Sequence, residues 1–258
     1  MNHTTQTKQT PYILRLGLWL LIVLHTIRGV LTLSILFPFL NRQQKDHHIR
    51  RWCKRLLKIF GLHLTVEGGE LLPSTPYLLV SNHISWIDIH VINAFKPVRF
   101  VAKSEVASWP IFGWMAKQLG TVFIRRDSAR HARQVVDQMA DVLKTESVCI
   151  FPEGTSSSGE TVLPFKPNLF EPAAISHTPV WSLAISYHSR KTGERSLATA
   201  FIGDMGLVES MAMILKSPDL GVTLHFLPPL QAQPGQDLDR KLLCQHSYQA
   251  ISAAISVP

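Results

Sequence analysis

Two side chains that can cooperate in proton transfer lie five residues apart in SNHISWIDIH, residues 81–90. The preceding YLLVS predicts a strand ending at Ser81 and Asn82, which puts His83 at the carboxyl edge of a sheet, where open α/β sheets bind ligands. If a helix begins near Ser85, Asp88 lies about one turn into it and can point back at the imidazole. A carboxylate on one ring nitrogen fixes the tautomer and raises the basicity of the ring, so that the other nitrogen can take a proton from a hydroxyl. By spacing alone, a helix-capping cluster with a structural histidine is the more common explanation.

A second polar segment, FPEGTSSSGE at residues 151–160, follows the predicted strand SVCIF. Glu153 and Thr155 therefore emerge at the carboxyl end of a strand, and Gly154 lets the backbone turn and leaves N–H groups for an anionic or hydroxyl-rich ligand. A third segment, GTVFIRR at residues 120–126, puts Arg125 and Arg126 at the end of another strand, where a guanidinium suits a phosphate group. The alternatives are an ordinary polar turn and two solvated arginines.

The elements that must position these residues are β-rich runs alternating with helical patterns from residue 62 onward. The predicted strands are HLTVE, YLLVS, VRFVA, TVFIR, SVCIF, VWSLAIS, ATAFI and VTLHFL. After a cap at Asp127 or Ser128, apolar residues recur at helical spacing; they are Ala132, Val135, Val136, Met139, Val142 and Leu143. This alternation is typical of an α/β fold with a mainly parallel, helix-covered sheet. No repeat or linker interrupts it, so we expect one catalytic domain over residues 61–258.

Residues 1–60 are predicted to anchor this domain to a membrane. Between Leu16 and Leu40 the only Lys, Arg, Asp or Glu is Arg28. The apolar stretch, residues 13–40, suffices for a spanning helix of about 20 residues, although a central arginine costs roughly 2.5–3.5 kcal/mol on insertion scales. Arg28 and Gly29 could instead form the turn of a helical hairpin in one leaflet, and a buried helix pair is a third alternative. Residues 42–58, basic and amphipathic, would then lie on anionic headgroups and keep the domain cytoplasmic.

Composition limits the partners. The net charge is +8 and the pI is about 9.6, which indicates an acidic partner: nucleic acid, an anionic membrane surface or an acidic carrier protein. No recognition helix or aromatic RNA-binding motif supports nucleic acid. The three cysteines lie far apart without C-x-x-C spacing, which argues against a zinc ribbon or a disulfide framework and fits a reducing compartment.

Taken together, NHISWID, GTVFIRR and FPEGTS, in this order and at these separations, closely resemble the bacterial 1-acylglycerol-3-phosphate acyltransferases and the wider glycerolipid acyltransferase family. The resemblance covers residues 60–200 and includes FVAKSEV and FKPNLFEPA. It implies transfer of a fatty acyl group from acyl carrier protein or coenzyme A to 1-acylglycerol-3-phosphate, giving phosphatidic acid. It also implies no metal or redox cofactor, and a place on the cytoplasmic side of a bacterial inner membrane.

The resemblance also implies roles for individual residues. His83 is expected to act as general base and Asp88 to orient it. The acceptor site is expected to include residues of the second motif, GTVFIRR, and of the third, FPEGTS; these are Gly120, Phe123, Ile124, Arg126, Phe151, Pro152, Glu153, Gly154 and Thr155. Two lysines common in the family, Lys103 and Lys166, could add phosphate contacts.

Two departures from the family pattern concern the acceptor. Arg125 stands where an acidic residue is common, and Ser182 stands where a proline is usual in the fourth motif, PVWSLAI. An acceptor other than lysophosphatidic acid, such as a lyso-ornithine lipid, is therefore an open alternative. A catalytically silent lipid-binding membrane protein is the alternative outside enzymology.

Overall fold

The polar segments follow strands of one seven-stranded sheet, as expected from their sequence context. The structure is a computed structural model that describes residues 9–124, 129–229 and 239–256. The strands are β1 Leu62–Glu67, β2 Leu78–Ser81, β3 Arg99–Lys103, β4 Val122–Ile124, β5 Val148–Ile150, β6 Val180–Ser189 and β7 Leu220–Leu227. They lie in the order β1-β7-β6-β2-β5-β3-β4, and every neighbouring pair is parallel except β6 and β7. The prediction of a mainly parallel sheet is confirmed.

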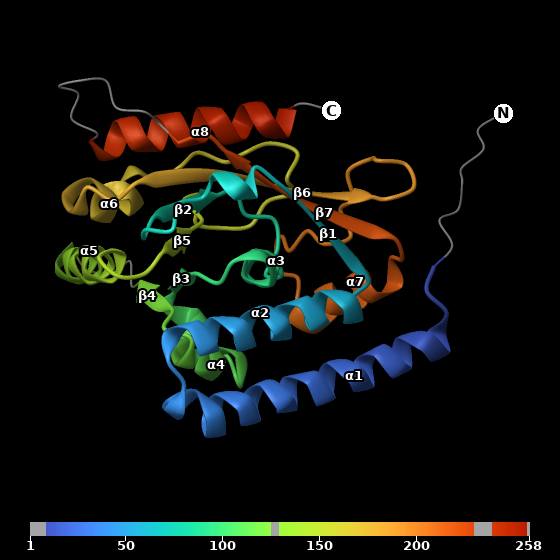
Figure 1. The fold of residues 1–258 in the computed structure, drawn as a ribbon. Helices are drawn as coiled ribbons and strands as arrows, with labels where there is room; N and C mark the ends of the chain where they lie inside the picture. The colour runs from blue at the N-terminus through green and yellow to red at the C-terminus, as the bar shows by residue number, and fades with distance from the viewer. Residues whose placement is uncertain (1–8, 125–128, 230–238, 257–258) are drawn as a thin grey trace.

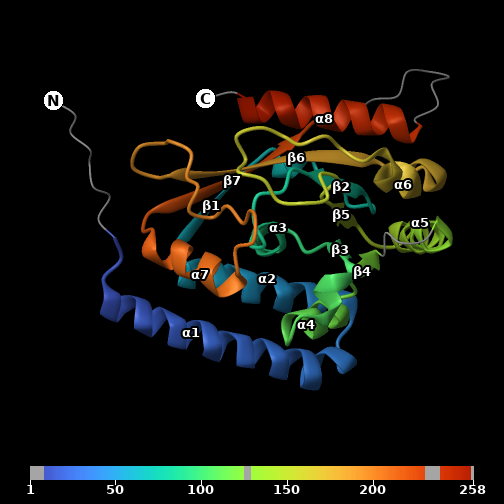
Figure 2. The same ribbon diagram turned by 180° about the vertical axis from the view of Figure 1, so that it is seen from behind.

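Helices cover both faces of this sheet (Figures 1 and 2). They are α1 Tyr12–Leu31, α2 Arg42–Ile59, α3 Asp88–Phe95, α4 Phe112–Gln118, α5 Ala129–Leu143, α6 Glu171–Ser176, α7 Leu207–Lys216 and α8 Arg240–Ser256. Strand β2 shows how side chains divide between the faces. Leu79 shares a buried cluster with residues of α2 and α3, whereas Leu78 and Val80 share one with residues of α5 and α8. Because both faces are covered, β2 is buried along its whole length and reads as a continuous apolar run.

One predicted strand is wrong. The segment ATAFI, residues 198–202, does not join the sheet; its Phe201 N–H donates to the carbonyl oxygen of Ile84, 2.9 Å away, in the loop that follows β2. The segment therefore crosses the carboxyl edge of the sheet as irregular chain. The predicted helix after β4 is present as α5, with Val135, Met139 and Leu143 buried, while its expected cap at Asp127 or Ser128 lies outside the described residues.

The apolar N-terminal stretch is one continuous helix through Arg28 and Gly29, as the first expectation had it, so the alternative of a hairpin turn at these two residues is wrong. Gly29 serves close packing instead: a Cβ there would lie 2.7 Å from Nε1 of Trp52 on α2. The helix continues through a π-helical turn, Thr32–Leu36, and a short 3-10 turn, Phe37–Phe39. The chain then reverses at Asn41, whose side chain and that of Gln44 form a capping box at the start of α2.

Helix α1 is not a core helix. It lies along α2 at the surface (Figure 1), and only 28% of its most apolar stretch is buried. The helical stretch Tyr12–Phe39 has 28 residues and a mean hydropathy of 2.1, long and apolar enough to cross a membrane. Its exposed large apolar side chains are Tyr12, Ile13, Leu14, Leu16, Leu20, Leu21, Val23, Leu24, Ile27, Leu31, Ile35, Leu36 and Phe39.

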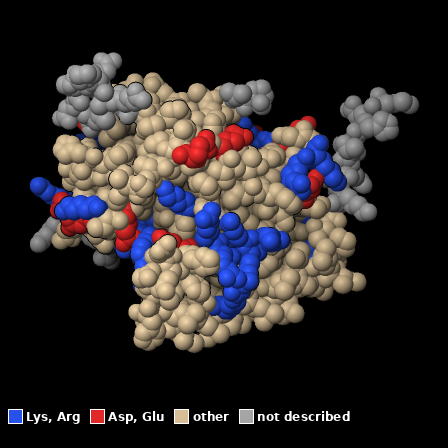
Figure 3. Space-filling model, in the orientation of Figure 1, with Lys and Arg blue, Asp and Glu red and all other residues tan. Residues whose placement is uncertain are grey.

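Helix α2 has the predicted basic amphipathic character. Cys53, Leu56 and Leu57 are buried against the sheet domain, and the cations form a basic surface that crosses the face seen in Figure 3. These cations are Arg42, Lys45, Arg50, Arg51, Lys54, Arg55 and Lys58. The apolar surface of α1 and the basic surface of α2 therefore lie next to each other.

Candidate active site

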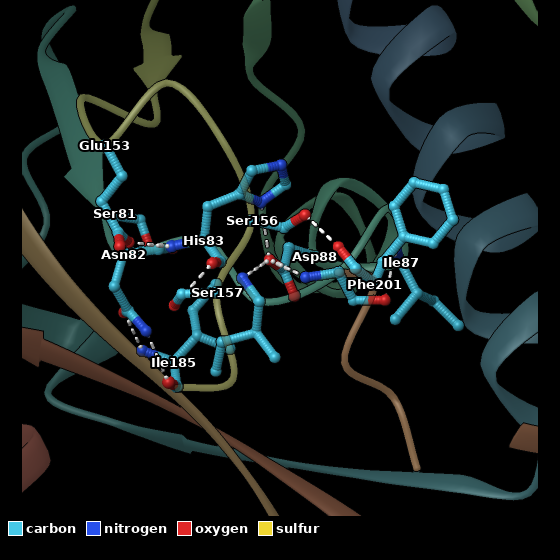
Figure 4. A network of polar contacts seen from close by, with 12 residues as sticks. Ser81, Asn82, His83, Ile87, Asp88, Glu153, Ser156, Ser157, Ile185 and Phe201 are labelled. Carbon is cyan, nitrogen blue, oxygen red and sulfur yellow. Dashed lines mark hydrogen bonds and ion pairs between the residues drawn. The ribbon is translucent and has the colours of Figure 1, made fainter. Parts of the chain in front are cut away.

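His83 lies just past the carboxyl end of β2, as predicted. The turn after β2 is fixed by Asn82, whose side-chain amide donates to the carbonyl oxygen of Ile185 on β6 at 3.0 Å and accepts from its N–H at 2.8 Å (Figure 4). Asn82 thereby replaces one step of the β2–β6 ladder with side-chain hydrogen bonds. The backbone of β2 can then leave the sheet while His83 stays at its edge.

The carboxylate of Asp88 organises this turn. Its Oδ2 accepts hydrogen bonds from Nδ1 of His83 at 2.9 Å, from the N–H of Ile84 at 2.8 Å and from the N–H of Ser85 at 2.9 Å. Asp88 is the first residue of α3, so the helix starts later than the predicted Ser85, and the carboxylate reaches back from the N-terminus rather than from one turn inside. Residues 83–88 fold around a buried anion, which fixes both the position and the tautomer of the imidazole.

The remaining ring nitrogen of His83 is available for chemistry. Because Nδ1 donates to Asp88, the neutral ring leaves Nε2 as an acceptor, and no described residue donates a hydrogen bond to it. The side chain is 20% exposed, whereas that of Asp88 is fully buried. The ring of Phe151 stacks on the imidazole with centroids 4.1 Å apart, which covers one face of the ring. The arrangement fits a general base that meets its substrate from the open side.

Tyr187 on β6 is a residue of this site that the sequence analysis missed. Its hydroxyl donates to Oδ1 of Asp88 at 2.6 Å, so both carboxylate oxygens are hydrogen-bonded. Burial, together with the nearby Asp88, raises the pKa of Tyr187 well above its usual range, and the hydroxyl therefore remains a donor. A tyrosine within a strand carries no sequence signal for this role, because Asp88 is 99 residues away along the chain.

Glu153 points at the backbone behind His83. One carboxylate oxygen accepts the N–H of His83 at 2.6 Å and the other accepts the N–H of Leu163 at 2.9 Å, and the residue is 4% exposed. Burial raises its pKa. On the C-terminal side of His83, the N–H of Ser157 donates to the carbonyl oxygen of His83 at 2.8 Å (Figure 4). Segment 151–163 therefore holds the peptide groups on either side of the histidine.

The other predicted residues of the third motif surround this support. Phe151 and Pro152 are buried, Gly154 has a φ of +71°, and Thr155 is exposed at the tip of the turn. Ser156 donates from its hydroxyl to the carbonyl oxygen of Phe201, which ties the motif to the segment that crosses the sheet edge. Of this motif, Thr155 is the side chain most open to a ligand.

The second motif lies farther along the same edge. Ile124 ends β4, is partly buried like Phe123, and pairs in register with the exposed Lys103 of β3. Gly120 has a φ of +76° and leaves space for the guanidinium of Arg99. Parallel strands β2, β5, β3 and β4 place their carboxyl ends at one edge, as the site hypothesis requires.

Four further residues of the sequence analysis are Arg125, Arg126, Lys166 and Ser182. Arg125 and Arg126 lie outside the described residues. Lys166 is exposed, and its N–H donates to the carbonyl oxygen of Pro152 at 3.1 Å. Ser182 is 2% exposed and pairs with Val80 inside the sheet, so this departure from the family pattern concerns packing rather than the ligand edge.

An apolar cavity of about 180 Å³ adjoins the His83–Asp88 turn. Trp86, within that turn, lines it together with residues of α1, α2, α3, β3 and α4, among them Gly29, Trp52, His90, Phe100, Phe112 and Met115, and with Trp109 shortly before α4. A cavity with mainly apolar walls is suited to an aliphatic chain, and Trp86 is the residue of the His83–Asp88 turn that lines it.

Comparison with known proteins agrees with the geometry. A family described as Acyltransferase matches residues 63–186. The lyso-ornithine lipid O-acyltransferase of Pseudomonas aeruginosa is 35% identical over 80% of this chain and 77% of that relative. The 1-acyl-sn-glycerol-3-phosphate acyltransferase of Neisseria meningitidis serogroup B is 34% identical over 69% and 70%.

The crystal structure of the 1-acyl-sn-glycerophosphate acyltransferase of Thermotoga maritima shares the fold, with a TM-score of 0.71 and 21% identity over 94% of this chain and 93% of that chain. The fold and the family resemblance predicted from the three motifs are both confirmed. The chain belongs to the bacterial glycerolipid acyltransferase family, and its reaction is acyl transfer.

Proposed function

We propose that this protein moves a fatty acyl group from a thioester of acyl carrier protein or coenzyme A to the free hydroxyl of 1-acylglycerol-3-phosphate, giving phosphatidic acid. The observation that carries the proposal is the pair His83 and Asp88, with Nδ1 held at 2.9 Å and Nε2 open at the sheet edge. A base of this kind needs no serine or cysteine nucleophile, because the acceptor's own hydroxyl attacks.

The reaction follows from that geometry. Nε2 of His83 takes the hydroxyl proton as the oxygen attacks the thioester carbonyl carbon, and Asp88 stabilises the resulting imidazolium. The tetrahedral intermediate then collapses, the carbon–sulfur bond breaks, and the imidazolium returns the proton to the leaving thiolate. The products are the ester and the free thiol, and His83 is neutral again.

The rigidity of the site supports this role. His83 is held through its ring by Asp88, through its N–H by Glu153 and through its carbonyl oxygen by Ser157. A base fixed in this way loses little orientational freedom when the substrate binds, which favours the attacking geometry. The apolar cavity beside Trp86 is the proposed place for an acyl chain.

The surface of the N-terminal helices supports work at a membrane. The inner face of α1 packs on α2 through Ile22, His25 and Gly29, and its outer face is apolar and exposed. A helix held flat against the domain fits insertion into one leaflet better than a perpendicular span, with the cations of α2 on anionic headgroups. This surface supports the proposal that the protein works at a membrane, which the family resemblance suggests is the cytoplasmic face of a bacterial inner membrane.

A lyso-ornithine lipid is the second candidate acceptor. The relatives that carry that name include proteins from Pseudomonas aeruginosa and Rhizobium meliloti, the latter 37% identical over 76% of this chain. The same base serves either acceptor, because each presents a free hydroxyl. The difference lies in the group that the site recognises, a phosphate or an amino acid.

Product analysis separates these candidates. Purified full-length protein is offered a panel of lyso-lipids with acyl carrier protein or coenzyme A thioesters, and products are identified by mass spectrometry. Phosphatidic acid as the main product supports 1-acylglycerol-3-phosphate as the acceptor. Acylated ornithine lipid as the main product supports a lyso-ornithine lipid instead. A protein that releases no thiol with any pair, while still binding lyso-lipid, is a lipid-binding protein and not an enzyme.

A further inference from the structure

Large apolar side chains are exposed in the turn that enters α4, at residues 109–114. Trp109 is 37% exposed, Ile111 is 53% exposed and Trp114 is 36% exposed. Single exposed apolar residues are common on protein surfaces, but a cluster that includes two tryptophans marks a contact with something outside the molecule. We call residues 109–114 the tryptophan turn.

The backbone of the tryptophan turn is held in a costly conformation. Ile111 has φ 62° and ψ −58°, and the N–H of Phe112 donates to the carbonyl oxygen of Pro110 at 2.6 Å. These values define a γ-turn with positive φ, a rare and strained form, and here its centre is a β-branched residue. Glycine would adopt this conformation at lower cost, yet a large apolar side chain stands at the tip in water.

The surroundings of the tryptophan turn join it to the exposed face of α1. Met115, a buried residue of α4, shares a buried cluster with Leu33 and Phe37 at the end of the α1 stretch. Figures 1 and 2 show α4 beside that end of α1, on the side of the molecule away from α8. The exposed apolar residues of this end of α1 are Ile27, Leu31, Ile35, Leu36 and Phe39.

The chemistry of the tryptophan turn favours a lipid interface over a protein partner. Tryptophan combines a large apolar ring with one N–H donor and is enriched where hydrocarbon meets headgroups. Lys117, exposed one turn beyond Trp114, adds a cation that can remain at headgroup level. Continuity with the apolar face of α1 means that one bilayer could cover both surfaces.

We propose that the tryptophan turn is a second membrane contact, which inserts Ile111 and Trp114 into the bilayer interface beside α1. The inference rests on the proposed membrane location of α1. One helix fixes the depth of the protein but allows it to roll about the helix axis, and a second contact removes that freedom. Trp109 and Phe112 also line the apolar cavity, so this contact turns the cavity toward the lipid.

The test uses the full-length protein on vesicles whose lipids carry brominated acyl chains, which quench tryptophan fluorescence on contact. Wild type is compared with Trp114→Phe and with the control Trp181→Phe, since Trp181 is only 7% exposed within the sheet domain. We expect Trp114→Phe to remove a quenched component of the emission and Trp181→Phe to remove an unquenched one. Equal quenching of wild type and Trp114→Phe on bound protein overturns the inference and leaves the membrane location intact.

A second measurement covers the insertion energy. The double substitution Ile111→Ser, Trp114→Ser should lower the vesicle partition coefficient at limiting lipid by about tenfold or more, as expected for large apolar side chains that are no longer buried. Ile175→Ser on α6 is the matched control, since Ile175 is 50% exposed and distant from α1, and it should partition like wild type. A double variant that partitions like the control contradicts the proposal.

Two further measurements separate the second contact from a folding defect and from the proposed membrane location of α1. Ile111→Gly keeps the positive φ without strain, so it should unfold at no lower temperature than wild type and still partition more weakly. If wild type itself does not bind vesicles, the proposed membrane location fails, and the second contact fails with it.

Discussion

The role of Glu153 gives the sharpest prediction. The family resemblance puts this residue in the acceptor site, whereas the structure directs both of its carboxylate oxygens to backbone N–H groups, those of His83 and Leu163. Replacement by glutamine preserves size and shape but leaves one oxygen and one NH₂ group. One of the two N–H donors then faces another donor instead of an acceptor.

The expected cost follows from these contacts. A hydrogen bond to a charged group contributes roughly 1.5–3 kcal/mol, and a buried donor left without a partner costs about 1–3 kcal/mol. Glutamine carries no charge, so it avoids the cost of burying one; in Glu153 that cost appears as a raised pKa. This gain offsets part of the loss, and the unfolding free energy should fall by about 1–3 kcal/mol in total. Because His83 loses its fixed position, kcat should fall by roughly 10- to 100-fold.

Acceptor saturation kinetics and thermal unfolding of Glu153→Gln test this reasoning. We expect a lower kcat and a lower unfolding temperature. The acceptor KM should stay within about twofold of wild type, because Glu153 contacts the protein backbone and does not bind the acceptor itself. Glu160→Gln, at an exposed carboxylate in the same segment, is the control and should match wild type. A stable Glu153→Gln protein with unchanged kcat and a strongly raised acceptor KM would refute the support role and restore the ligand-binding one.

Other predictions follow from the same contacts. His83→Ala should reduce turnover by about 10²- to 10⁴-fold without loss of fold, and Asp88→Asn should retain a small residual activity, both measured by thiol release on folded protein. Tyr187→Phe should lower the unfolding free energy by roughly 1.5–3 kcal/mol and kcat by less than His83→Ala does, because Oδ2 of Asp88 still holds the imidazole. Burial lowers the pKa of His90 to about 4, so the unfolded chain binds a proton there before the folded one does. Stability should therefore fall as pH drops from about 6.5 to 4, and His90→Phe should remove roughly 1–3 kcal/mol of that fall in unfolding experiments at both ends of the range. High salt alone should not extract the full-length protein from membranes, whereas a chain starting at residue 61 should lose tight association; complete extraction by salt would contradict apolar insertion.

Much of the sheet could be predicted because its strands are locally distinct. Central parallel strands such as β2 and β5 are buried on both faces and therefore appear as short, uninterrupted apolar runs. The polar residues that follow these runs mark the carboxyl edge, which is why His83 and Glu153 could be assigned to one edge before any contact was known. ATAFI passes the same local test and is not a strand, because its hydrogen bonds go to Ile84 and to a turn rather than to a neighbouring strand.

The direction in which a side chain points could not be predicted in the same way. Glu153 and Thr155 are two residues apart in one motif, yet the first faces the protein backbone and the second faces solvent. The difference depends on the N–H groups of His83 and Leu163, which the turn after β2 and the segment after the motif bring to the carboxylate. The partnership of Tyr187 with Asp88 is hidden for the same reason, since it depends on the pairing of β6 with β2.

Gly29 on α1 and Ile111 in the tryptophan turn show how context reverses a local expectation. Gly29 beside Arg28 suggests a turn, but the ring of Trp52 occupies the space of the missing side chain, so the glycine permits two helices to touch and the chain to run on. Ile111 suggests an ordinary apolar position, but its backbone adopts the conformation that glycine favours. In both cases the residue type is explained by what lies against it: a second helix for Gly29 and, we propose, the lipid bilayer for Ile111. The exposed face of α1 and the tryptophan turn would together hold the cavity and His83 at a fixed height above the membrane. A base that acts on a lipid hydroxyl requires such a fixed position.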